Sequence, residues 1–85
     1  MRTPYEDVTS PGRLRAFTAG DFGSLIRRRR KELGYTQEYM ADVLGWSPRL
    51  IGDIERGKAT VGIQRVLDLA TNLGIDVTLS VRGKD

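Results

Sequence analysis

Side chains that could recognise DNA bases gather within one short segment, residues 37–56. Arg49 is the strongest candidate, because a guanidinium can donate two parallel hydrogen bonds to O6 and N7 of guanine, worth roughly 1–3 kcal/mol of discrimination. Asp53, one helical turn later, could accept a hydrogen bond from cytosine N4. The segment therefore predicts a surface that contacts base edges in the major groove, with four residues at reading positions: Ser47, Pro48, Arg49 and Asp53.

Three further residues could hold phosphates beside that surface. Gln37 begins a predicted helix, where its side chain and the N–H groups of the helix start can bind a phosphate. Arg56 and Lys58 follow the next predicted helix and could reach neighbouring phosphates, or could lie at a helix end that favours cations. Arg49 has a plainer interpretation as a solvated arginine, and Asp53 as a carboxylate that repels phosphates or pairs with a nearby arginine.

Two short helices must position these side chains. The first is predicted over residues 37–44, with Thr36 as its N-cap. The second is predicted over residues 48–56, with Ser47 as its N-cap and Pro48 at the first helical position, where a missing N–H is harmless. Both helix starts are therefore marked in the sequence.

The connection between the two helices is Gly45, which can adopt the positive φ that a tight turn needs. Small Ala41 lets the helices cross closely, and Gly52 indicates a close backbone approach or a tolerated cost of about 1 kcal/mol. Apolar side chains predicted to face inward are Met40, Leu44, Ile51 and Ile54. Together these features are typical of a helix-turn-helix.

Two longer helices are predicted around this unit, over residues 20–33 and 61–73. The apolar stripe of the first helix passes through its basic run, so one arginine of the run must point toward the core. A buried guanidinium needs a carboxylate partner. Glu55 follows the buried face of the 48–56 helix, and the sequence therefore predicts a structural ion pair between Arg30 and Glu55.

The hydrophobic period changes to two residues after Gly74, which predicts a β-strand with one buried face. The apolar positions are Ile75, Val77, Leu79 and Val81. A lone strand needs a partner for its backbone, and either the N-terminal arm or the same strand of a second copy could supply it. We favour an antiparallel pair about a two-fold axis, since the arm shows no comparable alternation. The expected organisation is a flexible arm over residues 1–18, a helix-turn-helix domain over 19–74, and a dimerisation strand and tail over 75–85.

Composition limits the remaining functions. The chain has 85 residues, enough for one small domain, and it contains no Cys and no His. This excludes a disulfide framework, the usual metal sites and His-based catalysis, so neither an enzyme nor a cofactor is expected. The net charge is +3, and the basic excess falls within residues 1–34, which suits a polyanionic partner. The beginning lacks an apolar signal core and no stretch suits a membrane span, so a soluble cytoplasmic protein is expected.

The stretch from Ile26 to Lys58, with Arg-Lys-Glu-Leu-Gly-Tyr-Thr-Gln-Glu near its start and Ile-Glu-Arg-Gly-Lys at its end, resembles the XRE family, the lambda-repressor and Cro-like helix-turn-helix domains. The resemblance covers roughly residues 20–74. It implies a mainly α bundle of about five helices, Gln37 on phosphate, and the four base-reading positions named above. Tyr39 departs from the pattern, because relatives usually place Glu there, so the reciprocal capping box is absent.

Within that family, residues 60–79 look like the tail of HipB-type antitoxins. This implies a C-terminal strand paired across a homodimer, repression of the protein's own operon at palindromic sites, and binding of a HipA-like serine/threonine kinase toxin. A phage-type or metabolic repressor without a toxin remains an alternative. So does a protein-interaction module that mainly restrains a kinase.

Overall fold

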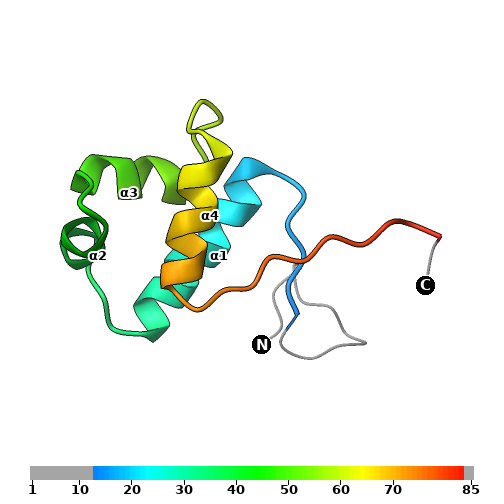
Figure 1. Ribbon diagram of the computed structural model, residues 1–85, viewed down its shortest axis with the longest axis horizontal. Helices are drawn as coiled ribbons and strands as arrows, with labels where there is room; N and C mark the ends of the chain where they lie inside the picture. The colour runs from blue at the N-terminus through cyan, green and yellow to red at the C-terminus, as the bar shows by residue number, and fades with distance from the viewer. Residues whose placement is uncertain (1–12, 84–85) are drawn as a thin grey trace.

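The computed structural model describes residues 13–83, and these form four helices. They are α1 (Ala19–Glu32), α2 (Gln37–Leu44), α3 (Pro48–Glu55) and α4 (Ile63–Asn72). Figure 1 shows α2 and α3 at one end of the molecule, with the C-terminal segment running from the end of α4 toward the other. The mainly helical class and the helix-turn-helix are therefore confirmed. None of the four helices is long and apolar enough to cross a membrane.

Capping side chains set the helix starts. Thr36 Oγ1 accepts from the Tyr39 N–H at 3.0 Å, and α2 has the bounds that the sequence predicted. α1 begins one residue earlier than predicted, because Thr18 Oγ1 accepts from the Asp21 N–H at 3.0 Å while Asp21 Oδ2 accepts from the Phe17 N–H at 2.9 Å. This two-way cap was missed, although Thr-x-x-Asp is visible in the sequence.

The prediction of five helices is wrong for the described residues, which form four. The resemblance that implied a fifth helix covers residues 20–74, and there the links between consecutive helices are only residues 33–36, 45–47 and 56–62. The longest link consists of turns and bends and contains Gly57 at a left-handed φ of 77°, so it holds no further helix. After α4, residues 75–81 are neither helical nor part of a strand. Their two-residue alternation offers no apolar stripe with a helical period, so nothing there would bury one face of a helix.

The predicted strand does not form within this chain either, because it meets no backbone partner in the described part. Ile75 packs against the core, but Val77, Leu79 and Val81 are 42%, 95% and 67% exposed. The face expected to be buried is therefore open. The arm expected over residues 1–18 lies mostly outside the described residues; residues 13–17 precede α1 and are exposed.

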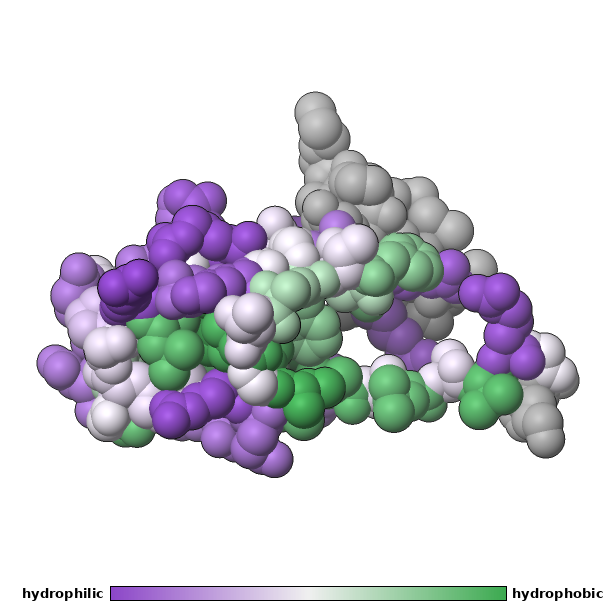
Figure 2. Space-filling model, turned by 90° about the horizontal axis from the view of Figure 1, so that it is seen from above, coloured by the Kyte–Doolittle hydropathy of each residue, from purple (hydrophilic) through white to green (hydrophobic). Residues whose placement is uncertain are grey.

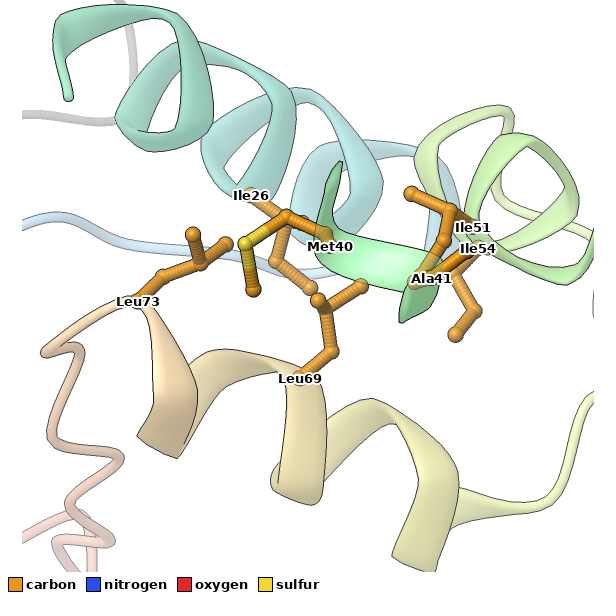
Figure 3. Packing of buried hydrophobic residues seen from close by; sticks show 7 residues of the cluster. All are labelled: Ile26, Met40, Ala41, Ile51, Ile54, Leu69 and Leu73. Carbon is orange, nitrogen blue, oxygen red and sulfur yellow. The ribbon is translucent and has the colours of Figure 1, made fainter. Parts of the chain in front are cut away.

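The core lies where all four helices meet (Figure 3). Ala41 is fully buried, which permits close packing of α2 within that core. Its apolar members are Ile26, Met40, Ala41, Ile51, Ile54, Leu69 and Leu73. α1 approaches α3 so closely that a Cβ placed on Gly23 would collide with the backbone carbonyl groups of Ile54 and Glu55. α3, which carries the predicted reading positions, is thus packed against both α1 and α2.

Gly23→Ala should therefore lower the free energy of unfolding by about 1–3 kcal/mol, as overpacking does when the obstacle is backbone that cannot move aside. Gly20→Ala is the matched control on the same helix, since its Cβ would meet only Thr18 Oγ1 at an ordinary 3.6 Å. Chemical denaturation followed by circular dichroism measures both. Equal stability of the two variants would contradict close packing of α1 on α3.

Candidate nucleic-acid interface

The first turn of α3 presents its predicted reading residues to solvent. Ser47, Pro48 and Arg49 are all exposed. Ser47 Oγ accepts from the Leu50 N–H at 3.3 Å, and Pro48 occupies the first turn of the helix. The hydroxyl keeps its proton as a donor, and the Arg49 guanidinium keeps its planar set of donors. This turn can therefore offer donors to base edges without unfolding its own cap.

The turn before α3 fixes how the two helices are set. Gly45 has φ 71°, and the Trp46 N–H donates to the Ala41 carbonyl at 2.8 Å, which closes the end of α2. The Arg65 guanidinium of α4 lies over the Trp46 ring at 5.1 Å from the centroid. This cation–π contact ties the turn to α4. No sequence pattern indicated it, because it joins residues 19 positions apart.

Behind α3, the structure brings Arg30 and Glu55 together as a two-point pair. Arg30 Nε lies 2.6 Å from Glu55 Oε2, and Arg30 Nη2 donates to Glu55 Oε1 at 3.0 Å. The side chains are only 8% and 2% exposed. Arg30 Nη1 also donates to the Tyr35 carbonyl at 2.7 Å. Hydrogen bonding to Glu55 raises the pKa of Arg30 above its ordinary value, so this guanidinium stays charged at every physiological pH.

Glu55 also receives a hydrogen bond from a residue predicted to touch phosphate. Gln37 Nε2 donates to Glu55 Oε1 at 3.2 Å, and Gln37 is partly buried. Arg27 adds a longer approach, with Nε 3.9 Å from the same oxygen. The start of α2 and the end of α3 are therefore joined through one buried carboxylate. The hydrogen bond to Glu55 therefore fixes the position of the Gln37 side-chain amide.

Asp53, Arg56 and Lys58, which we call the Asp53 cluster, lie together at the far end of α3. Arg56 Nη2 lies 2.6 Å from Asp53 Oδ1, and Lys58 Nζ lies 3.7 Å from Asp53 Oδ2. The Asp53 side chain is only 16% exposed, against 68% for Arg56 and 50% for Lys58. Of the interpretations open for Asp53, pairing with a neighbouring arginine is the one that this geometry shows.

Gly52 is explained by the same cluster. A Cβ at this position would lie 2.9 Å from Arg56 Nη1, so the missing side chain leaves room for the Arg56 guanidinium beside the helix backbone. The group that approaches the backbone of α3 at Gly52 is therefore the Arg56 guanidinium of the same chain. The sequence could not distinguish that contact from one with DNA or a partner protein.

The basic run of α1 does not form one charged face. Besides the buried Arg30, the exposed Arg28 and half-buried Arg29 approach Glu32 at 3.9 and 3.7 Å. Arg29 Nε also donates to the Leu73 carbonyl at 3.0 Å, across to the end of α4. The described residues contain no group of three or more His, Cys, Asp or Glu placed to hold a metal ion.

A glycine turn between two short helices, with a capped and solvent-exposed front on the second, defines a DNA-binding helix-turn-helix domain. A helix-turn-helix family model (HTH_3) matches residues 26–79. The chain belongs to this XRE-type family of transcriptional regulators.

Similar proteins agree with that assignment. An uncharacterised HTH-type transcriptional regulator of Sinorhizobium fredii, y4mF, is 37% identical over 67 residues, which cover 79% of this chain and 88% of the relative. The fold resembles that of a HipB variant in a complex with an O2 20mer, with a TM-score of 0.73 at 16% identity over 80% of this chain and 94% of that one. The restriction-modification controller protein C.AhdI of Aeromonas hydrophila gives 0.59 at 34% identity, over 68% and 84%.

Proposed function

We propose that this protein is a sequence-specific repressor that binds a palindromic operator through the first turn of α3. The observation that carries the proposal is the exposed front of α3, where Arg49 stands beside a fixed cap and turn. Arg49 would read guanine, with Ser47 as a second donor and Pro48 in van der Waals contact. Gln37, Arg56 and Lys58 would lie toward phosphates on either side.

The operator would be palindromic because we propose a homodimer. The apolar side chains of residues 77, 79 and 81 stand exposed at two-residue spacing in an extended segment. Figure 2 shows apolar residues in a broken row along the lower edge of the molecule, from its middle toward the right-hand end. An antiparallel pair of such segments would cover them and satisfy their backbone groups. Two recognition helices would then contact half-sites about one helical turn apart, roughly 34–36 Å.

We further propose that the repressor is a HipB-like antitoxin, which represses its own operon and restrains a HipA-like serine/threonine kinase. The likeness of fold to HipB over most of both chains supports this, together with the alternating segment after α4. Co-expression with the product of a neighbouring kinase-like gene tests it. A complex that co-purifies and loses kinase activity is expected, and a repressor that binds its operator but no such kinase would favour the phage-type or metabolic alternative.

DNA binding itself is tested by a gel shift with the protein's own promoter, against a scrambled duplex of equal length, over a series of salt concentrations. A specific repressor should retain the promoter at roughly 10⁻⁸ M or tighter and the scrambled duplex at least a thousandfold more weakly. Equal retention of the two duplexes would reject the repressor function.

Arg49→Ala should cost roughly tenfold to a hundredfold in preference for the operator over scrambled DNA, because the bidentate contact with guanine is lost. Binding to scrambled DNA should weaken much less. Lys31→Ala is the matched control, since it removes an equal charge from an exposed position at the end of α1. Equal losses on both duplexes for Arg49→Ala would reduce this residue to a phosphate contact.

A further inference from the structure

The proposed DNA surface contains its own counterion. Arg56 and Lys58, the two cations that follow α3, both approach Asp53, at 2.6 and 3.7 Å. Asp53 is the least exposed member of the cluster, and its carboxylate uses one oxygen for each cation. In the free protein one negative charge therefore lies against the two positive ones, so the cluster carries a net charge of +1 rather than +2 before any phosphate arrives.

The arrangement is supported by local structure. Gly52 leaves the space in which the Arg56 guanidinium lies, and an alanine there would have to displace it. The Lys58 N–H donates to the Asp53 carbonyl at 2.9 Å, which turns the chain so that the Lys58 side chain returns toward α3. Backbone and side chains thus direct both cations to one carboxylate.

We infer that Asp53 is a specificity-determining residue, which withholds Arg56 and Lys58 from sequence-independent contact with phosphate. Nonspecific binding to DNA draws almost entirely on such contacts. A carboxylate that competes for the two cations, and that repels the phosphates itself, weakens binding to every sequence. The base contacts made by the first turn of α3 then determine which DNA sequence the protein prefers. The inference rests on the proposed DNA binding and assigns Asp53 a role other than reading a base.

The test is the salt dependence of binding to a random-sequence duplex, measured for the wild type and Asp53→Asn by fluorescence anisotropy. The amide keeps the shape of the side chain and removes its charge. Binding of Asp53→Asn to random DNA should tighten at least tenfold at low salt. The slope of log K against log salt should steepen by about 0.9 for each cation released to a phosphate. Affinity for the operator should change less, so the ratio between operator and random DNA should fall.

Asp68→Asn is the matched control. It makes the same change in net charge, but the Asp68 carboxylate accepts from the Gln64 amide rather than from a cation. If Asp68→Asn tightens random binding as much as Asp53→Asn, the effect is one of net charge alone and the inference is rejected. An unchanged slope for Asp53→Asn rejects it equally.

A double-mutant cycle tests whether Asp53 withholds Arg56, the cation with the shorter contact. Arg56→Ala should weaken random binding more in the Asp53→Asn background than in the wild type, because only there is the guanidinium released. Equal effects in the two backgrounds would overturn the inference for Arg56. Failure of the wild type to bind its operator would reject the proposed function instead, so the two failures are distinguishable. Thermal unfolding of each variant establishes that it is folded at the assay temperature.

Discussion

Glu55→Ala should lower the free energy of unfolding by about 3–5 kcal/mol, because it leaves Arg30 buried and charged without its carboxylate. Two short hydrogen bonds from Arg30 would be lost, and so would the bond from Gln37. Hydrogen bonding to Glu55 raises the pKa of Arg30, so the contribution of the charged guanidinium to stability is fully present below its unfolded-state pKa and is lost as the pH rises through the folded value. In the Glu55→Ala variant, the unpaired guanidinium of Arg30 stays charged at neutral and acidic pH. Urea denaturation followed by circular dichroism measures the loss.

Glu32→Ala provides the comparison on the exterior. Glu32 also approaches two arginines of α1, but at 3.7 and 3.9 Å and with its side chain 52% exposed. Removing a surface pair of this kind should cost no more than about 1 kcal/mol. Replacing both Arg30 and Glu55 by hydrophobic residues of similar volume should recover much of the stability. If Glu55→Ala costs no more than Glu32→Ala, the buried pair does not support the fold.

Replacing Val77 and Leu79 together by Lys should convert the proposed dimer into monomers. Two lysines of each copy would enter an interface built from apolar side chains, and like charges would face each other across the two-fold axis. A monomer retains one recognition helix and loses the gain from joining two half-sites, which is roughly 10²–10⁴ in affinity. Size-exclusion chromatography with light scattering measures the mass, and anisotropy measures the affinity for the operator.

The matched control adds equal charge to the other side of the same segment. Thr78→Lys with Ser80→Lys changes two positions that alternate with the apolar ones and that are also exposed. This variant should remain dimeric and retain its affinity for the operator. A Val77/Leu79 variant that elutes as an unchanged dimer would reject the shared-strand interface, wherever else the two copies met.

The parts of the fold that sequence reasoning placed well are those with local causes. Thr36 and Ser47 mark where α2 and α3 begin because each supplies an acceptor to an N–H three residues later. The Arg30–Glu55 pair came from a conflict within the sequence, since a basic run could not fit on one outer face of a helix whose apolar stripe crossed it. A contradiction in local pattern is informative, because only a tertiary contact can resolve it.

Other features depend on contacts that no local pattern contains. The three members of the Asp53 cluster were predicted as DNA contacts, with pairing of Asp53 to a nearby arginine left open, because the sequence does not show which way the turn after α3 carries Lys58. The fifth helix followed from resemblance alone. The strand followed from its alternation, but a strand needs a second backbone, and residues 13–74 provide none for it.

The hydrogen bond from Arg29 to the Leu73 carbonyl joins the last turn of α1 to the point where the chain leaves α4. This contact anchors the end of α4 and so helps to set the direction in which the following segment leaves the domain. Under the proposed dimer, this direction sets the angle between the two recognition helices and hence the operator spacing that they match. One residue inserted into α4 would turn the departing segment by about 100°. The length of α4 would then determine the spacing between the two half-sites of the operator. A change in this helix alone would suit the dimer to a palindrome of different spacing.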